Sequence, residues 1–446
     1  MADDLGWGDV AYNGHPVLKT PHLDRLASEG IRFDRFYAGS AVCSPTRGSV
    51  LTGRHPDRYG IATANAGHLK QQEISLAEVL AERGYATGHF GKWHLGTLAP
   101  DFSGKGPGRR PRLNYMTPGM AGFAEWFSTE YAVATWDPYD PKNAHGKFDA
   151  RNLYWHNGRN IVQGPAAGLS GCDSRIIMDQ ALTFIRQAAE KSQPFLAVVW
   201  FHAPHAPVVG GPKYRALYPN EIENRQHYFA TITALDEQMG RLVQTLRELE
   251  IDENTMLWFC SDNGPAGKGG GTGQAAGGRQ QGSAGSFRGR KGSLYEGGVR
   301  VPGILHWPAF AQKHRVVAMP CVTSDYFPTI LDSLDIELAG KPRSWDGISL
   351  MPLLEGKINE RPRPIAFEYH RQAALVDNRY KLVVSSAASR AGRSANKESA
   401  ELYDLIDDPG ERSDIAGEHP EIVDKMRKTL RQWQASCQAS SRGEDY

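Results

Sequence analysis

The sequence predicts an α/β protein with a mixed, mostly parallel central sheet flanked by helices, followed by a small antiparallel sheet with one helix. Apolar runs alternate with amphipathic stretches along most of the chain, as expected when strands and covering helices follow one another. The runs Phe195–Phe201 and Thr255–Cys260 are almost continuously apolar, which is typical of strands buried on both faces. From about Asp346 the pattern changes to Pro-rich segments and short strand-like pieces.

Local signals predict the elements of the first part in order. Thr20 and Pro21 suit the cap and the first position of a helix that ends near Gly30. Apolar residues at helical spacing then predict the short helix Ile74–Arg83, which Gly84 closes. The remaining predictions are the strand Ile31–Tyr37, the strand Tyr85–Phe90, the helices Ile176–Lys191 and Tyr228–Leu249, and the strand Val299–His306.

The length of 446 residues exceeds the ~150 residues typical of one domain, so a large domain with a smaller one is expected. We expect residues 1–350 to form the larger α/β domain, which would hold the active site, and residues 351–446 a small α+β subdomain. The short strands of the second part are predicted at Ile365–Tyr369, Ala374–Val376, Tyr380–Val384 and Glu401–Leu405, with a closing helix at Glu421–Trp433.

The composition excludes several classes of protein. The 51 Lys and Arg residues nearly balance 50 Asp and Glu, so no overall field favours nucleic acid as a partner. No apolar run reaches the ~18 residues of a membrane span. The five cysteines are widely spaced and contain no CxxC pair, so neither a zinc ribbon nor a disulfide framework is expected. The chain opens with Met1-Ala2-Asp3-Asp4, and we expect no signal peptide in it.

A long stretch between two predicted strands, residues 264–290, is dominated by Gly, Ala, Ser and Gln. It is too long and too poor in apolar residues for a core element. We expect its middle to be a surface insertion, although a loop of this length beside a site is also suited to act as a lid.

Polar residues follow the predicted buried strands, at the edge where an open α/β sheet places its ligands. They are Asp262 and Asn263 after Thr255–Cys260, His202 and His205 after Phe195–Phe201, Lys92 and His94 after Tyr85–Phe90, and Asp3 and Asp4 at the start of the chain. Each signal alone is weak. Asp-Asn-Gly is common in turns, and a histidine after a strand is often only a satisfied polar residue. We interpret His202, which lies off the motif, as a supporting residue.

The strongest local signal is Cys43-Ser44-Pro45-Thr46-Arg47. Pro45 suits the start of a helix, whose N-terminal N–H groups and dipole favour an anion and lower the pKa of a thiol, so an unmodified Cys43 could itself be nucleophilic. A thiolate phosphatase needs Cys and Arg six positions apart, whereas Cys43 and Arg47 are four apart. That alternative fails on spacing.

The pattern as a whole resembles the type I sulfatases, which are members of the alkaline phosphatase superfamily. Cys43-x-Pro45-x-Arg47, followed by Leu51-Thr52-Gly53-Arg54, is similar to the family signature. The further matches, in chain order, are Asp3-Asp4, Lys92-x-His94, Ala203-Pro204-His205, Asp262-Asn263-Gly264, Lys291 within Gly289–Arg300, and Asp346-Gly347 before the small C-terminal domain. Ordered matches over nearly the whole chain are specific, whereas any one of them is not.

The resemblance implies a cofactor, a maturation partner and roles for the matched residues. A formylglycine-generating enzyme would convert Cys43 to formylglycine (3-oxoalanine), whose hydrated aldehyde is the nucleophile of the family. Asp3, Asp4, Asp262 and Asn263, together with the modified Cys43, would bind Ca²⁺, with Mg²⁺ also suited to such oxygen ligands. Arg47 would stabilise the modified residue, Lys92 and Lys291 would neutralise the sulfate, His205 would protonate the leaving alcohol, and His94 would help release sulfate.

The substrate is expected to be a sulfated carbohydrate, with a small aryl sulfate as an artificial one. The aromatic residues between Phe123 and His156 are suited to stack on sugar rings, although filling a core is the more common role of such residues. Arg109, Arg110 and Arg112 are suited to attract further anionic groups. A phosphonate or phosphate ester hydrolase of the same superfamily, and a catalytically silent metal- and carbohydrate-binding relative, stay open as alternatives.

The start of the chain departs from the family pattern. The family has an apolar strand before the acidic pair, and only Met1 and Ala2 precede Asp3 here, so the first strand is expected to be missing and the two ligands to lie on a frayed terminus. The family is usually exported, which leaves the localisation of this chain open.

Overall fold

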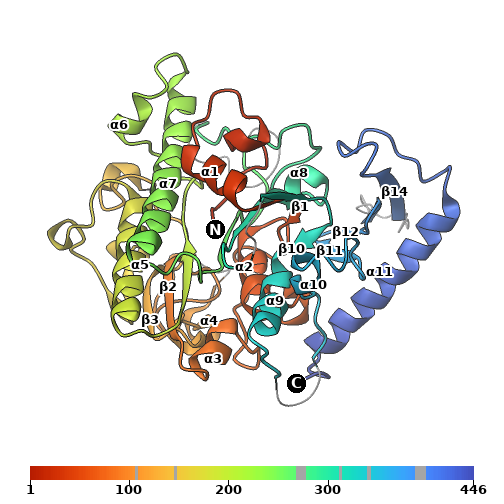
Figure 1. Cartoon of the computed structure of the whole chain (residues 1–446), viewed down its shortest axis with the longest axis horizontal. Helices are drawn as coiled ribbons and strands as arrows, with labels where there is room; N and C mark the ends of the chain where they lie inside the picture. The colour runs from red at the N-terminus through yellow and green to blue at the C-terminus, as the bar shows by residue number, and fades with distance from the viewer. Residues whose placement is uncertain (106–108, 145–147, 268–277, 311–313, 339–342, 387–397) are drawn as a thin grey trace.

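In the computed structural model, two five-stranded sheets are joined edge to edge by the first residues of the chain (Figure 1). The structure describes residues 1–105, 109–144, 148–267, 278–310, 314–338, 343–386 and 398–446. One sheet has the order β10-β1-β8-β7 with β9 beside β1, and the other β5-β4-β3-β2-β6. Their bounds are β1 Ile31–Tyr37, β7 Leu257–Cys260, β8 Arg300–His306, β9 Arg315–Val317, β10 Cys321–Val322, β2 Ala86–Lys92, β3 Glu125–Thr129, β4 Trp155–His156, β5 Arg159–Asn160 and β6 Phe195–Trp200.

The first three residues link β6 to β7. The Met1 amino group donates to the Val199 carbonyl at 2.8 Å, and the Ala2 N–H donates to the Cys260 carbonyl at 2.8 Å. Ala2 also forms a parallel bridge with Ser261. The structure thus has these residues paired on both sides, where the sequence led us to expect a frayed terminus, and that expectation was wrong.

The central sheet is mixed, as predicted. Strands β3, β2 and β6 run parallel, whereas β8 runs antiparallel to both β1 and β7, and β4 runs antiparallel to β3. Parallel pairing recurs at the far edge of β1, which runs parallel to both β9 and β10. The strand β3, which lies inside the aromatic stretch, was not predicted, because its aromatic residues gave no clear alternation.

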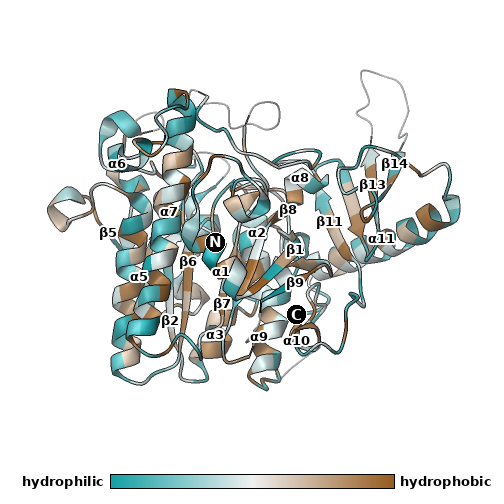
Figure 2. Cartoon of the chain, turned by 45° about the horizontal axis from the view of Figure 1, so that its top comes forward, coloured by the Kyte–Doolittle hydropathy of each residue, from teal (hydrophilic) through white to brown (hydrophobic). Residues whose placement is uncertain are grey.

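Helices cover both faces of the sheet (Figure 2). On one face α1, α5 and α7 pack over a core that includes Phe90, Ile177 and Leu235, and on the other α2, α3 and α9 pack over a core around Trp93 and Trp200. Their bounds are α1 Pro21–Glu29, α2 Cys43–Thr52, α3 Leu76–Ala81, α5 Asp173–Glu190, α7 Glu223–Glu248 and α9 Tyr326–Ser333, with the short helices α4 Pro111–Asn114, α6 Pro212–Arg215, α8 Glu296–Val299 and α10 Met351–Leu354. No helix among the described residues is long and apolar enough to cross a membrane.

The C-terminal part is the predicted small antiparallel sheet with one helix. Strands β11 Ile365–Tyr369, β12 Gln372–Val376, β13 Tyr380–Ser386 and β14 Glu398–Asp404 follow one another in order, and α11 Pro420–Ser441 closes the chain. Side chains alternate between faces. Val383 and Tyr403 pack toward the larger part, while their neighbours Leu382 and Leu402 pack against α11.

A buried group of charges lies between the C-terminal sheet and the larger part, and we call it the joint cluster: Tyr37, Glu296, Arg300, Lys381 and Glu411. Lys381 Nζ lies 2.9 Å from Glu296 Oε1 and 3.0 Å from Glu411 Oε1. The second oxygen of Glu296 accepts from the Tyr37 hydroxyl at 2.9 Å and from Arg300 at 3.2 Å, and the second oxygen of Glu411 accepts the Glu296 N–H at 2.6 Å. Every carboxylate oxygen of the joint cluster therefore has a close partner.

Candidate active site

The predicted site residues meet at one edge of the sheet. Lys92 is the last residue of β2, and His94 follows two residues later. His205 lies in the loop after β6, and Asp262 lies two residues after the end of β7. These ends point the same way because β2 and β6 are parallel and the first residues of the chain pair in parallel with the segment after β7.

The acidic pair is buried and fixed. Asp3 is 0% exposed and its N–H donates to the Ala203 carbonyl at 3.0 Å. Asp4 is 2% exposed and its N–H donates to Asp262 Oδ1 at 3.1 Å. Asp4 has a φ of 66°, a left-handed conformation that is uncommon for a residue other than glycine and is found most often at functional sites.

Three carboxylates and three cations form what we call the site cluster: Asp3, Asp4, Asp262, Arg47, Lys92 and Lys291. They pair one to one, with 2.6 Å between Lys92 Nζ and Asp3, 2.5 Å between Lys291 Nζ and Asp4, and 2.6 Å between Arg47 Nη2 and Asp262. Burial opposes the ionisation of Asp3, but the nearby cationic groups, with Lys92 the largest contributor, together outweigh it and hold the pKa of that carboxyl well below its usual value. Burial and the neighbouring Asp3 raise the pKa of Asp262 to about 7.

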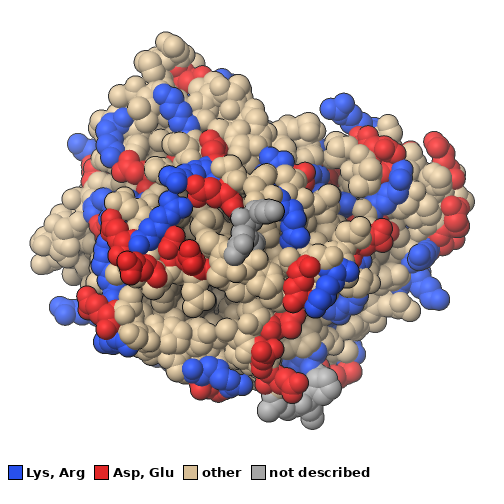
Figure 3. Space-filling view, viewed as in Figure 1, with Lys and Arg blue, Asp and Glu red and all other residues tan. Residues whose placement is uncertain are grey.

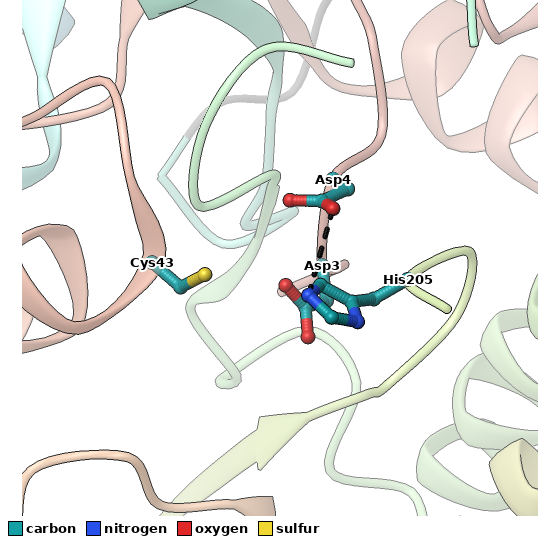
Figure 4. A group of neighbouring side chains, drawn as sticks. All are labelled: Asp3, Asp4, Cys43 and His205. Carbon is teal, nitrogen blue, oxygen red and sulfur yellow. Dashed lines mark ion pairs between the residues drawn. The ribbon is translucent and has the colours of Figure 1, made fainter. Parts of the chain in front are cut away.

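Three buried oxygens in the site cluster and on the adjacent Asn263 have no hydrogen-bond partner among the described residues: Asp3 Oδ1, Asp4 Oδ2 and Asn263 Oδ1. The Asn263 amide is oriented by its donation to Asp4 Oδ1 at 2.7 Å. Ligand atoms of Asp3, Asp4, Cys43 and His205 lie within 4.8 Å of one another, and Figure 4 shows the Cys43 sulfur directed toward the acidic pair. Unpaired carboxylate and amide oxygens are costly when buried, and they are the ligands that Ca²⁺ and Mg²⁺ prefer. The residues present therefore fit a hard divalent cation.

Cys43 is the first residue of α2 and is 1% exposed. Lys291 Nζ lies 3.5 Å from its sulfur. Burial raises the pKa of the Cys43 thiol, although Lys291 and Lys92 act in the opposite direction. The direction of this shift is opposite to the lowering that the position at a helix N-terminus led us to expect, with burial as the largest cause.

The two site histidines have different surroundings. His205 Nδ1 donates to the Ala206 carbonyl at 2.6 Å, and its Nε2 lies 3.7 Å from Asp4. Burial lowers the pKa of His205 to about 4, although Asp3 and Asp4 act against this. His94 is buried and neither ring nitrogen has a hydrogen-bond partner in the described part of the chain. Burial and the cation of Lys92 hold the pKa of His94 well below its usual value.

Arg47 and Arg109 are both buried, and both hold other parts of the site. Arg47 donates twice to Asp262 Oδ2 and once to the Lys92 carbonyl at 3.1 Å, and its guanidinium lies over the Trp200 ring. Arg109 donates to the His94 carbonyl at 2.7 Å. The expectation that Arg109 attracts anionic substrate groups was wrong, because its side chain is enclosed behind His94. Arg110 and Arg112 are exposed.

Most of the aromatic residues of the stretch 123–156 fill the core and are not available to a sugar. Phe123, Trp126, Phe127, Tyr139 and Tyr154 are at most 8% exposed. For these five residues the more common role, filling a core, is the one that the structure has. Trp136, Trp155 and Tyr131 are half-buried.

Lys105 was not predicted as a site residue. Its amine lies 4.4 Å from the centre of the Tyr131 ring. Burial and the cation of Lys92 lower the pKa of Lys105 to about 8. Glu130 precedes Tyr131 in the chain, and its carbonyl accepts the His94 N–H at 3.0 Å. Lys105, which contacts Tyr131, therefore lies on the same side of the site as His94. A single lysine in a Gly-rich segment gives no signal that sequence reasoning could have used.

A cleft of about 1200 Å³ opens from the site between the larger part and the C-terminal sheet. Lys291 lies in its lining together with Arg288 and Arg290, and the turn between β11 and β12 contributes Tyr369 and His370. The sequence gave no reason to connect Tyr369 with Lys291, since 78 positions separate them. The described residues 278–290 of the Gly-rich stretch line this cleft in part, and the middle of the stretch, where a surface insertion or lid was expected, lies outside the described residues at 268–277.

Family comparisons match most of the chain. The sequence model of the family described as Sulfatase matches residues 1–336, and that described as N-sulphoglucosamine sulphohydrolase, C-terminal, matches residues 282–436. N-acetylgalactosamine-6-sulfatase from Sus scrofa is 33% identical over 81% of this chain and 66% of its own length, and steryl-sulfatase from Mus musculus is 31% identical over 97% of this chain and 80% of its own length. The chain spans about two thirds of the length of the N-acetylgalactosamine-6-sulfatases that it matches.

Solved structures share the fold over nearly the whole chain. Ps i-CgsB in complex with k-i-k-neocarrahexaose superposes with a TM-score of 0.81 at 24% identity, covering 99% of this chain and 93% of that one. A Bacteroides thetaiotaomicron structure from work on the metabolism of multiple glycosaminoglycans has a TM-score of 0.76 at 27% identity, covering 98% of both chains. The match of the Sulfatase model to residues 1–336 and the relatives above 30% identity lead to one conclusion: the chain belongs to the sulfatase family.

Proposed function

We propose that the protein hydrolyses sulfate esters of a sulfated carbohydrate, with a nucleophile derived from Cys43 and a divalent cation held by Asp3, Asp4, Asp262 and Asn263. The observation that carries the proposal is the set of three buried, unpartnered oxygens beside the Cys43 sulfur. Each such oxygen costs free energy unless a ligand binds it, and the gathering of three of them at one point favours a bound cation there.

The residues around this point have distinct tasks in the proposed reaction. Formylglycine at position 43 would supply a hydrated aldehyde as nucleophile, and a bound Ca²⁺ or Mg²⁺ would polarise the ester. Lys92 and Lys291 offer ammonium groups to the sulfate oxygens, where charge builds up during transfer. Arg47 donates to the Asp262 carboxylate and to the Lys92 carbonyl at the end of β2. It therefore holds a proposed cation ligand and a proposed sulfate-binding lysine in fixed relative positions.

The two histidines would move protons. His205 is oriented by the Ala206 carbonyl, which leaves Nε2 free to donate a proton to the departing alcohol. The low pKa of His205 makes its protonated form a strong acid, and an anionic ester bound beside it favours that form. His94, with both nitrogens unpartnered among the described residues, is suited to hydrogen-bond the nucleophile and assist the release of sulfate.

A carbohydrate substrate is supported by the relatives named as N-acetylgalactosamine-6-sulfatases and by the fold shared with a structure bound to k-i-k-neocarrahexaose. The domain division belongs to the same proposal: residues 1–350 would carry the chemistry, and residues 351–446 would form a subdomain that completes the rim of the cleft. A formylglycine-generating enzyme is the maturation partner that the proposal requires.

The first test is the mass of the peptide that contains Cys43, after co-expression with a formylglycine-generating enzyme. We expect the mass loss that accompanies conversion of the thiol to the aldehyde, and hydrolysis of 4-nitrophenyl sulfate by the converted protein. An unmodified Cys43, when a control substrate of the same enzyme is converted, would contradict the proposal and favour the silent binding relative.

Phosphonate and phosphate ester hydrolysis stays open as the alternative reaction. A phosphonate monoester hydrolase of Agrobacterium radiobacter shares the fold with a TM-score of 0.65 at 20% identity. Rates on 4-nitrophenyl sulfate, phosphate and phenylphosphonate, measured on the same matured sample, separate the two. A preference for phosphonate would replace the sulfatase proposal.

A further inference from the structure

The cleft beside the site is larger than one sulfated sugar needs. Its volume is about 1200 Å³, whereas pockets that enclose a whole drug-sized ligand measure roughly 300–1,000 Å³. Its lining comes from Gly8 and residues 13–17, from Glu221 and the start of α7, from residues between Gln281 and Tyr295, and from the β11–β12 turn. Lys291 is part of the lining, and its amine contacts Asp4 and the Cys43 sulfur, so the cleft borders the site cluster.

The lining is strongly cationic, although the whole chain carries a net charge of only +1. Arg225, Arg288, Arg290 and Lys291 all contribute to it, and Glu221 is the one acidic residue of the lining. Acidic and basic side chains are interspersed over the face of the molecule in Figure 3, so the cleft differs from the general surface. A concave, cationic lining concentrates anions.

The cationic side chains of the cleft differ in the hydrogen bonds, ring contacts and ion pairs that they already make within the protein. Arg288 donates to the Tyr403 hydroxyl at 2.6 Å and its guanidinium lies 3.8 Å from the centre of the Tyr295 ring. Arg290 donates to the Gly282 carbonyl. Arg225 is held least: its ion pair with Glu221 spans 3.4 Å, and its side chain is 53% exposed. Arg225 is therefore the cation with the most capacity for a ligand.

We propose that the cleft binds a sulfated oligosaccharide of more than one sugar ring, and that Arg225 contacts an anionic group on a ring beyond the one that carries the reacting sulfate. The inference rests on the proposed sulfatase function and extends it. The reacting sulfate lies at Lys92 and Lys291, and the chain of sugars continues along the cleft. Tyr369, whose ring borders Gly292 at the Lys291 end, offers a face on which the first ring stacks.

The test measures binding to the Cys43→Ser protein, which holds the site without turning over a substrate. Hexasaccharides of chondroitin sulfate, heparan sulfate and carrageenan are each compared with the disaccharide of the same series by calorimetry. At least one hexasaccharide should bind about tenfold more tightly than its disaccharide, which corresponds to about 1.4 kcal/mol. The advantage should shrink as salt is added, because the contact is ionic.

Arg225→Gln, made in the Cys43→Ser protein, should remove most of that advantage while leaving disaccharide binding unchanged. Arg431→Gln is the matched control, since Arg431 is 67% exposed on α11 and its ion pair with Glu398 spans 3.8 Å. The control should keep the full advantage. Equal binding of hexasaccharide and disaccharide in all three series would overturn the inference, as would an Arg225→Gln protein that keeps the tenfold difference.

The proposed function is judged separately, on matured wild-type protein and 4-nitrophenyl sulfate, which carries no second ring or second anionic group for Arg225 to contact. Hydrolysis of this ester without any gain from longer chains would reject the extended cleft alone. No hydrolysis by a protein whose Cys43 is fully converted would reject the sulfatase function itself.

Discussion

The site cluster and the joint cluster are both buried groups of carboxylates and cations, but they differ in what they leave unpaired. In the joint cluster each carboxylate oxygen of Glu296 and Glu411 lies within 3.2 Å of a donor atom, including Glu411 Oε1, which has no hydrogen bond of good geometry but lies 3.0 Å from Lys381 Nζ. In the site cluster, Asp3 Oδ1 and Asp4 Oδ2 also lack a hydrogen bond among the described residues, and their ion pairs with Arg47 and His205 span 3.7 Å. In this sense we call the joint cluster complete and the site cluster incomplete. The looser pairing of buried charge in this protein is found at the proposed reactive site.

The largest expected effect concerns the residue next to the incomplete cluster. Cys43→Ala should lower kcat on 4-nitrophenyl sulfate by about a thousandfold or more, because it removes the proposed nucleophile, with little change in melting temperature. Cys437→Ala, in the buried face of α11, is the control and should keep full activity. Activity that survives Cys43→Ala would mean that the nucleophile lies elsewhere.

A substitution in the joint cluster should lower the stability of the protein and leave its activity almost unchanged. Lys381→Met leaves Glu296 and Glu411 buried without their shared cation, so the free energy of unfolding should fall by about 3–5 kcal/mol. Urea unfolding measures this, and the rate per folded molecule should change little. Lys425→Met, on the exposed side of α11, is the control. A loss below about 1 kcal/mol would show that the joint cluster does not hold the two parts together.

A bound Ca²⁺ or Mg²⁺ should stabilise the protein through the site cluster and not through the joint cluster. At a Ca²⁺ concentration of about 100 times Kd, the folded state should gain about 2.7 kcal/mol, seen as a rise in melting temperature, and a chelator should reverse both this gain and the activity. Asp4→Asn should abolish the response, whereas Asp424→Asn on α11 should keep it. A melting temperature that ignores Ca²⁺ and Mg²⁺ would remove the basis for a metal site.

The smallest effect is a pH dependence within the joint cluster. Burial raises the pKa of Glu411 to about 7, above its ordinary value of 4.5, so the folded state holds this proton more tightly than the unfolded chain does. The stability it contributes is present at low pH and is lost as pH rises through 7, by about 1 kcal/mol between pH 6 and pH 8. Glu411→Gln should flatten this part of the stability profile. An unchanged profile in the variant would show that Glu411 does not titrate there.

Sequence analysis predicted which residues form the site better than it predicted the burial and contacts around them. His205 and Asp262 follow strands whose apolar runs are plain in the sequence, and Lys92 and His94 follow a further predicted strand, so their convergence could be predicted. The burial of Arg109 beside the His94 carbonyl could not, because it depends on a contact that sequence spacing does not encode. The same holds for the raised pKa of Cys43, whose largest cause is burial.

The fold likewise combines features that the local sequence predicts with features that depend on pairing between distant segments. The C-terminal sheet was predicted from short strand-like pieces such as Tyr380–Val384 that follow Pro-rich segments, because both are local properties of the sequence. The pairing of Met1 and Ala2 between β6 and β7 involves partners about 200 and 260 positions away, and the sequence around Met1 contains no trace of them. The antiparallel direction of β8 against β1 and β7 is likewise set by long-range pairing.

The β11–β12 turn has a consequence for how such proteins diversify. Its strands are held by side chains that point into the two cores, and Tyr369 both lines the cleft and packs against one of these cores. His370 and Arg371 at the tip belong to neither core, so they can be exchanged with little effect on the cores or on the residues around Cys43. A family built in this way can acquire new ligand preferences by replacing one short hairpin tip, and a graft of that tip between two relatives is a direct route to altered selectivity.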